Sequence, residues 1–162
     1  MNAPIPVPVL QLALRAALAA GLAVAIAQAF RLAFPLYAMI AAVIVTDLSP
    51  SQTRNLGLQR LTGTVLGAAL GAALSSLHAR GPWAIGLGIL VTIVLCHLFR
   101  LQGATKVAAY VCAIVMLEHG THPWSYALLR LAETVLGCCV AIGVSLVPKL
   151  MRIEASKNAD RG

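Results

Sequence analysis

Residues 57–71 read "GLQRLTGTVLGAALG", and residues 127–141 read "ALLRLAETVLGCCVA". A shift of seventy residues aligns the two stretches without a gap and places Arg60 on Arg130, Thr64 on Thr134 and Gly67 on Gly137. Matches between alanines or leucines are common in such an apolar chain, but arginine, threonine and glycine matches in one register are not. The two stretches therefore indicate an internal duplication.

The composition assigns the chain to the membrane proteins. Of its 162 residues, 60% are hydrophobic and 10% are charged. A soluble globule of this size needs more polar surface than these residues supply. We therefore expect an all-α integral membrane protein with the lipid bilayer as its solvent.

Six apolar stretches follow one another along the chain, at residues 10–30, 34–45, 61–77, 82–99, 107–117 and 124–147. A hydrocarbon core of about 30 Å needs about 20 helical residues. The second and fifth stretches are shorter, because their 11 or 12 residues correspond to only about 16 to 18 Å of helix. We predict six transmembrane helices, of which the second and fifth are short.

The duplication divides these helices into two units of three, at about residues 8–77 and 82–147. Three crossings are an odd number, so the second unit has the opposite orientation in the membrane, which is an inverted-topology repeat. The alternative is that two helix starts converged on similar packing. We expect a single membrane domain, residues 1–150, and a short polar cytoplasmic tail, residues 151–162, with no further domain.

The net charge of +7 is explained by membrane topology and does not indicate a nucleic-acid partner. With six spans and a cytoplasmic N-terminus, eight basic residues lie inside and two outside, whereas re-entrant short helices would give five on each side. Positive residues accumulate in cytoplasmic loops, so both termini are predicted to be cytoplasmic. The inner eight are Arg54, Arg60, Arg100, Lys106, Lys149, Arg152, Lys157 and Arg161, and the outer two are Arg31 and Arg80.

Each short stretch continues into polar residues, "TDLSPSQTRN" after the first and "EHGTHP" after the second. Pro50 and Gly120 correspond under the shift and both disfavour helix. Paired short hydrophobic segments in an inverted repeat indicate a transport site. We therefore predict non-helical backbone at the two ends of a central pathway, which is lined by the second and fifth helices and has a polar vestibule at each end.

Arg60 and Arg130 are predicted to begin the third and sixth helices, at the inner and the outer vestibule. A guanidinium beside the free N–H groups of a helix N-terminus suits a carboxylate or another anion. Alternatively, each arginine extends to the membrane interface or pairs with a carboxylate, Asp47 or Glu133. The predicted anion-binding residues are Arg60, Arg130, Thr64 and Thr134.

Asp47, Glu118 and Glu133 are the carboxylates that precede the polar tail. A carboxylate deep in a membrane can carry a proton and couple transport to the proton gradient, so all three are candidates for proton coupling. The alternative role is charge compensation for the arginines. Arg15 stands about five residues into the first helix, and we expect it to have a shallow, structural role.

Gly63, Gly67 and Gly71 recur every four residues and form a smooth helix face, and Gly137 matches the second of them. Such a face lets another helix approach closely in lipid. In the second copy Glu133 replaces the first of these glycines. The sequence contains no nucleophile and base pair, metal cluster or nucleotide-binding loop, so we expect neither an enzyme nor a cofactor.

Residues 38–74, "AMIAAVIVTDLSPSQTRNLGLQRLTGTVLGAALGAAL", resemble the signature of the fusaric acid resistance and aromatic acid exporter family. Its members have a short apolar helix, a loop with proline and threonine, and a helix start with arginine and glycines, here Arg60, Gly63, Thr64 and Gly67. The resemblance recurs weakly over residues 108–147.

The resemblance implies a six-helix unit that exports aromatic or other organic anions across a bacterial inner membrane by proton motive force. Plant aluminium-activated malate channels look distantly similar, so a passive anion channel is one alternative. A structural module of a larger efflux assembly is another. Larger relatives often act with a periplasmic adaptor, and a lone six-helix unit predicts a homo-oligomer, with a dimer favoured.

Overall fold

A computed structural model of the chain describes residues 7–77, 81–118 and 122–147, and all regular structure in these residues is helical. The predicted cytoplasmic tail lies outside the described residues. The expectation of an all-helical protein with six helices is confirmed for the described part of the chain. The helices are α1 Val7–Ala29, α2 Pro35–Val45, α3 Pro50–Ser76, α4 Pro82–Leu98, α5 Thr105–Glu118 and α6 Pro123–Ser145, with a 3-10 turn η1 at Gln102–Ala104.

The helices of the two halves correspond in order, and in each half the second helix is the shortest. The starts of α2 and α5, Pro35 and Thr105, are seventy residues apart, and the long helices α3 and α6 follow them in the same order. Proline occupies the first turn of α2, α3, α4 and α6. Proline suits this position because its missing N–H has no helical partner there.

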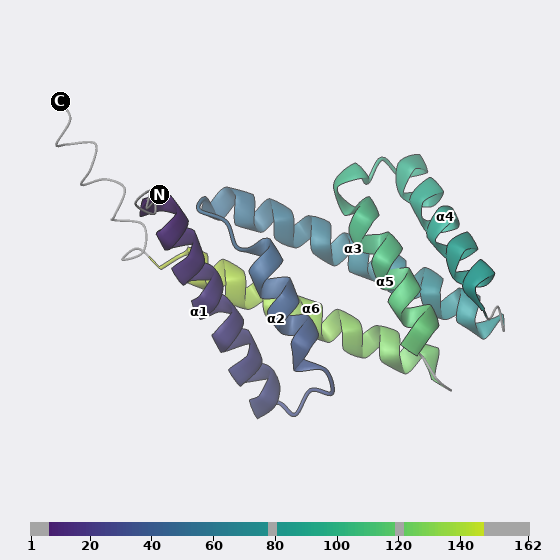
Figure 1. Cartoon of the computed structure of the whole chain (residues 1–162), viewed down its shortest axis with the longest axis horizontal. Helices are drawn as coiled ribbons and strands as arrows, with labels where there is room; N and C mark the ends of the chain where they lie inside the picture. Colours follow the sequence, from purple (N-terminus) through teal and green to yellow (C-terminus); the bar gives the residue numbers. More distant parts are fainter. Residues whose placement is uncertain (1–6, 78–80, 119–121, 148–162) are drawn as a thin grey trace, which may run out of the picture.

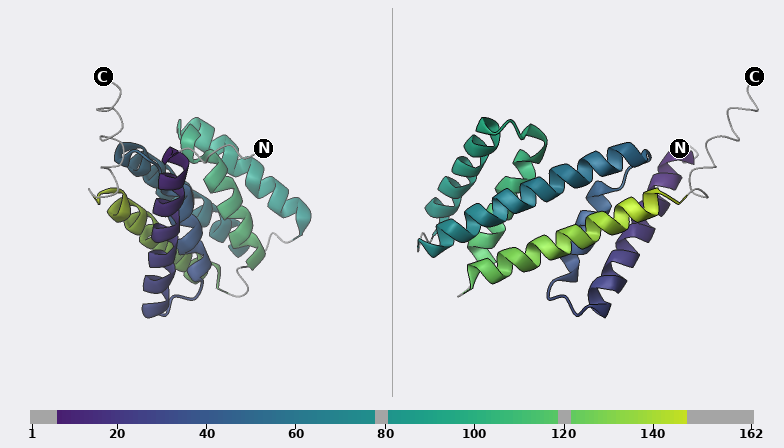
Figure 2. Two further views of the ribbon diagram at one scale, coloured as in Figure 1. Left: turned by 60° about the vertical axis from the view of Figure 1, so that its left-hand side comes forward. Right: turned by 180° about the vertical axis from the view of Figure 1, so that it is seen from behind.

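The long helices α3 and α6 form the centre of the molecule and run side by side in opposite directions (Figures 1 and 2). The α1–α2 hairpin lies at one end of this pair and the α4–α5 hairpin at the other (Figure 1). Helix α2 packs on α6, and α5 packs on α3. Each short helix therefore packs mainly on the long helix of the other half.

Glycines allow the closest of these contacts. A Cβ atom at Gly67 on α3 would lie 2.9 Å from the carbonyl carbon of Ala108 on α5, and one at Gly137 on α6 would lie 3.1 Å from that of Ala38 on α2. The shift of seventy residues relates Gly67 to Gly137 and Ala38 to Ala108, so it converts one contact into the other. The two contacts are therefore equivalent, and each brings helix backbones together without an intervening side chain.

Small apolar side chains are buried and large ones are exposed, which is the reverse of the distribution in a soluble protein. On α1, Ala19, Ala23 and Ala27 are fully buried, while Leu14 and Leu18 are half-exposed. The buried apolar residues of the described chain are mostly alanines, and large apolar side chains dominate the exposed set. A large exposed apolar surface in water promotes aggregation, but in lipid it costs nothing.

Two described helices are long and apolar enough to cross a membrane, at Pro8–Ala29 and Pro123–Ser145. Pro35–Val45 and Pro82–Leu98 are apolar but shorter. The described part of the chain thus supplies membrane-length helices in both halves. Helix α2 has 11 residues, as expected for a short helix, and α5 has 14.

One prediction about the backbone is wrong. Helix α3 begins at Pro50, so the polar residues 51–59 are helical, and Arg60 lies ten residues inside the helix and not at its N-terminus. Arg130 is likewise seven residues inside α6, which begins at Pro123. Proline at the first helical position begins a helix as readily as an interior proline breaks one. Gly120, the residue that corresponds to Pro50, lies outside the described residues.

We predict that Gly67→Ala and Gly137→Ala each lower the free energy of unfolding by about 1 to 3 kcal/mol, because the new methyl group overlaps the backbone of the facing helix. The matched control is Gly143→Ala on α6, where a Cβ atom meets nothing within 4 Å. Denaturant unfolding in detergent micelles measures all three variants. Equal stability of Gly137→Ala and Gly143→Ala would contradict the close approach.

Candidate functional site

Arg130 is buried in the protein and stacks on an aromatic ring. Its side chain is 3% exposed, and its Cζ atom lies 3.0 Å from the centroid of the Tyr37 ring, which α2 supplies. A guanidinium over an aromatic face is a cation–π contact, and such contacts are stronger when they are desolvated. The packing of α2 on α6 therefore holds the positive charge against an aromatic surface.

Two tyrosines and one carboxylate form a hydrogen-bonded group beside this stack. The Tyr37 hydroxyl donates to Glu118 Oε2 at 3.0 Å, and the Tyr126 hydroxyl donates to the same oxygen. The three residues come from α2, α5 and α6. An ionised carboxylate suits this geometry, because one of its oxygens accepts both protons. Glu118 thus joins the end of α5 to the two helices of the stack.

An open cavity of about 610 Å³ lies next to this group. The Phe34 ring packs against the rings of Tyr37 and Tyr126, with centroid distances of 5.9 and 5.5 Å. Tyr37 lines the cavity and also covers Arg130, which does not itself line it. The Tyr37 ring thus stands between an aromatic cavity and a buried guanidinium. The cavity lining is Ala33, Phe34, Pro35, Leu36, Tyr37, Glu118 and Tyr126.

Glu133 is fully buried and binds the beginning of α2. Its Oε1 accepts a hydrogen bond of 2.8 Å from the backbone N–H of Phe34, the residue before α2. The corresponding position in the first half is Gly63, where a Cβ atom would lie 2.8 Å from the carbonyl oxygen of Ala104. Gly63 thus allows a close contact with the Ala104 backbone. The corresponding Glu133 instead caps the beginning of α2 with its carboxylate.

The predicted hydrogen-bonded pair of Arg130 and Glu133 is not formed. Nε and Nη1 of Arg130 and Oε2 of Glu133 have no hydrogen-bond partner in the described part of the chain. Glu133 and Glu118 nevertheless lie near enough to Arg130 to interact with it electrostatically. The cluster around Arg130 thus contains two carboxylates and one guanidinium whose N–H groups are not all satisfied.

Arg60 is also buried, with 4% of its side chain exposed. Its Cζ lies 5.8 Å from the centroid of the Tyr110 ring on α5. The predicted alternative pairing with Asp47 is not formed in the described residues. Asp47 lies in the turn between α2 and α3, where its Oδ1 accepts a hydrogen bond of 3.1 Å from the Ser49 N–H. Neither arginine therefore lies in an open vestibule.

The threonines and glycines of the duplicated stretch lie on the inner faces of α3 and α6. Thr64 and Thr134 are buried, and the Thr134 hydroxyl donates to the Arg130 carbonyl oxygen at 2.9 Å. That hydroxyl proton therefore points along its own helix. A Cβ atom at Gly71 would lie 2.8 Å from the Cys112 carbonyl oxygen, which places this glycine on the face that contacts α5.

Arg15 is buried and does not have the shallow position that was expected for it. Its side chain is 1% exposed, and Nη1 donates to the Leu48 carbonyl oxygen at 2.5 Å. The bond joins α1 to the turn between α2 and α3. A cation that satisfies backbone carbonyls in this way stabilises the connection between the two segments.

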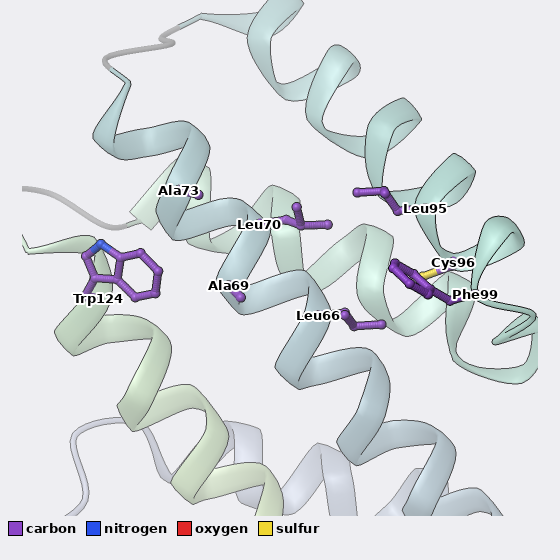
Figure 3. Close-up of a pocket in the computed structure, with 8 residues that line it drawn as sticks. All are labelled: Leu66, Ala69, Leu70, Ala73, Leu95, Cys96, Phe99 and Trp124. Atoms are coloured by element: carbon purple, nitrogen blue, oxygen red, sulfur yellow. The ribbon is translucent and has the colours of Figure 1, made fainter.

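A second, smaller cavity of about 370 Å³ is lined by residues of α3, by residues at the end of α4 and by Trp124 of α6 (Figure 3). Its lining is apolar and contains no charged group that could orient an anion. The first cavity is therefore the better candidate for a site for an organic anion. The lining residues are Leu66, Ala69, Leu70, Ala73, Leu95, Cys96, Phe99 and Trp124.

The sequence analysis missed the aromatic residues of the site. The chain has three tyrosines, Tyr37, Tyr110 and Tyr126, and each lies in a helix next to one of the two arginines or the carboxylate Glu118. A hydroxyl group in a lipid environment needs a hydrogen-bond partner. Tyrosines within apolar stretches were therefore a usable signal.

The comparisons agree with the description of a helical membrane protein. The model of the family described as "Aromatic acid exporter family member 1" matches residues 11–147. The chain belongs to the aromatic acid exporter family, which is a family of membrane transporters, and the resemblance seen in the sequence is confirmed.

A curated relative is a UPF0421 protein of Halalkalibacterium halodurans, which is 28% identical over 124 residues. The match covers 75% of this chain and 35% of that protein. The chain thus spans about a third of the length of this relative. No solved structure matches the chain.

We predict that Glu133→Gln unfolds at nearly the same denaturant concentration as the wild type, because its amide oxygen can still accept the Phe34 N–H. Glu133→Ala leaves this N–H without a partner and is expected to lose about 1 to 3 kcal/mol of stability. Unfolding in detergent measures both variants. An equally large loss in Glu133→Gln would show that the cap is not what Glu133 contributes.

Proposed function

We propose that the protein exports aromatic or other organic carboxylate anions across the bacterial inner membrane and that Arg130 binds the carboxylate group. The observation that carries this proposal is the buried Arg130 guanidinium, whose Nε and Nη1 lack hydrogen-bond partners among the described residues. This guanidinium lies directly beneath an aromatic cavity. Membership in the exporter family supplies the general activity.

The chemistry of this region suits an aromatic acid. A buried ionised group without partners is unfavourable, and a guanidinium binds a carboxylate through paired N–H donors. Phe34 and Tyr126 offer ring faces for stacking, and offset or edge contacts between aromatic rings are favourable. A cavity of about 610 Å³ also falls within the usual size range of small-molecule sites.

Tyr37 acts as the gate in this proposal. Its ring covers the Arg130 guanidinium, and its hydroxyl is held by Glu118. A carboxylate in the cavity reaches Arg130 only when the Tyr37 ring moves aside. Glu118 accepts hydrogen bonds from both Tyr37 and Tyr126. The Tyr37 ring can therefore move when these hydrogen bonds break.

Proton coupling follows from the charges around Arg130. Glu118 and Glu133 carry two negative charges against one positive charge, so an anionic substrate adds repulsion unless one carboxylate takes up a proton. Binding of the anion and protonation of a carboxylate are therefore linked, which makes the affinity for substrate depend on pH. Glu133 is the main candidate because its Oε2 has no hydrogen-bond partner in the described residues. Asp47 is the candidate in the turn after α2, outside this cluster.

We further propose that residues 1–150 form one membrane domain with six spans in two inverted repeats, of about residues 8–77 and 82–147, and with both termini in the cytoplasm. The antiparallel α3 and α6 (Figure 1) and the exchanged contacts of Gly67 and Gly137 support this arrangement. The pathway runs beside α2 and α5, with Arg60, Thr64 and Thr134 as further polar groups on it.

The proposed assembly is a homo-oligomer, with a dimer favoured, because a single bundle of this size offers little wall for a pathway. A periplasmic adaptor is a possible partner in the exporter proposal. Two alternatives make different predictions: a passive channel conducts anions without a proton gradient, and a structural module of a larger efflux assembly moves no anion by itself.

We predict that proteoliposomes take up labelled benzoate and that an imposed pH gradient changes the rate of uptake. Arg130→Gln should reduce uptake at least about tenfold, because the hydrogen-bonded charge pair between Arg130 and the benzoate carboxylate is lost. The matched control is Arg54→Gln, an exposed arginine on α3, which should transport like the wild type.

The same experiment separates the alternatives. Benzoate flux that does not respond to the pH gradient would favour a channel. No benzoate flux in the wild type under either condition would contradict transport by this chain, and stability changes without flux changes would favour the structural module.

Substrate affinity should also depend on pH. Protonation of Glu133 removes repulsion, so binding of benzoate to the wild type strengthens as the pH falls through the titration of this group and weakens as the pH rises. Glu133→Gln imitates the protonated form and should bind benzoate about tenfold more tightly at pH 7.5, with a flatter pH profile. Titration calorimetry in detergent measures both. An unchanged pH profile in Glu133→Gln would exclude this residue as the coupled group.

A further inference from the structure

We infer that Arg60 and Tyr110 form a binding site for a small inorganic anion of the halide class, at the contact of α3 with α5. This inference goes beyond the proposed transport, because it assigns a different class of anion to a second arginine, which the transport proposal places only as a polar group on the pathway. It rests on the Arg60 guanidinium and the Tyr110 side chain, which lie near each other on two packed helices and whose buried Nε, Nη1 and Oη atoms lack hydrogen-bond partners in the described residues.

The Arg60 guanidinium is a buried charge without a hydrogen-bonded counter-ion in the described part of the chain. Its side chain is 4% exposed, and neither Nε nor Nη1 has a partner among these residues. An ionised group in such a place is strongly unfavourable unless an anion or several acceptors surround it. The described groups that interact with Arg60 include the Tyr110 ring and the Cys138 thiol, and neither is an anion at neutral pH.

Tyr110 supplies the second donor. Its Oη atom is buried and has no hydrogen-bond partner in the described residues. The ring centroid lies 5.8 Å from Arg60 Cζ, whereas the Tyr37 centroid lies only 3.0 Å from Arg130 Cζ. The Arg60 guanidinium therefore does not lie against its ring as that of Arg130 does. An anion between the two groups would accept hydrogen bonds from Nε, Nη1 and the phenolic hydroxyl.

The charges distinguish this place from the Arg130 cluster. Glu118 and Glu133 both interact electrostatically with Arg130. The position that corresponds to Glu133 is Gly63, and in the described residues no carboxylate forms an ion pair with Arg60. The positive charge of Arg60 is thus uncompensated, while that of Arg130 is more than compensated. An anion at Arg60 therefore binds without the accompanying proton that the carboxylates around Arg130 require.

The surroundings also restrict the size of the anion. The positions that correspond to Phe34, Tyr37 and Tyr126 are Ala104, Val107 and Leu56, so no aromatic cage surrounds Arg60. Around it α3 and α5 approach closely, since a Cβ atom at Gly63 would lie 2.7 Å from the Val107 Cβ. This packing excludes a ring-bearing carboxylate, and a monatomic anion is the ligand that requires the smallest displacement of the two side chains.

Chloride itself is the probe for the test. The excess width of the ³⁵Cl NMR line reports chloride bound to the purified full-length chain in detergent. We expect saturable broadening with the wild type, at least about tenfold weaker binding in Arg60→Gln and Tyr110→Phe, and unchanged binding in Arg130→Gln. Size-exclusion chromatography and circular dichroism confirm that each variant is folded, and Tyr110→Phe is informative even where Arg60→Gln does not fold.

Three outcomes would overturn the inference. They are no saturable broadening with the wild type, full broadening with Tyr110→Phe, and displacement of chloride by benzoate, which would assign Arg60 to the substrate site. Benzoate binding that is lost in Arg130→Gln while chloride binding persists would support it. Failure of benzoate transport leaves the chloride result unaffected, so the two proposals fail separately.

Discussion

The close approach of helix backbones at Gly67 and Gly137 is the constraint on which the rest of the structure depends. Lipid offers helices no hydrophobic force for association, so packing and hydrogen bonds must hold them together. Glycine opposite alanine allows α5 to lie on α3 and α2 to lie on α6. These contacts bring Tyr37 to Arg130 and Tyr110 to Arg60, because each tyrosine is carried by a short helix and each arginine by a long one.

The two halves use this common frame differently. Near Arg130, Glu133 caps α2, and the Tyr37 ring covers the guanidinium and packs against Phe34. Near Arg60, a glycine, an alanine, a valine and a leucine occupy the positions that correspond to Glu133, Phe34, Tyr37 and Tyr126, and the arginine has only the more distant ring of Tyr110. The two similar stretches thus supply two buried guanidinium groups, and the residues around them give one an aromatic, acidic environment and leave the other without a paired carboxylate in the described residues. That asymmetry is the basis for assigning them different ligands.

Hydropathy and the seventy-residue shift predicted the six helices, their order and the short second helix, because these features depend on local composition. The start of α3 was not predicted, since Pro50 was interpreted as a helix breaker, although proline also begins a helix when the residues after it are helical. The environment of Arg130 was not predicted either. Its ring partner Tyr37 stands far away in the chain, and the carboxylate one turn along, Glu133, binds the Phe34 N–H. Contacts between distant segments depend on how the helices cross, which residue spacing alone does not specify.

A crystal structure of the protein with 4-bromobenzoate tests whether Arg130, beneath the aromatic cavity, is the carboxylate site. If it is, the structure shows an anomalous bromine peak in the cavity of Phe34 and Tyr126, the Tyr37 ring displaced, and the carboxylate hydrogen-bonded to Arg130. A carboxylate bound elsewhere, with Tyr37 still stacked on Arg130, would contradict this assignment.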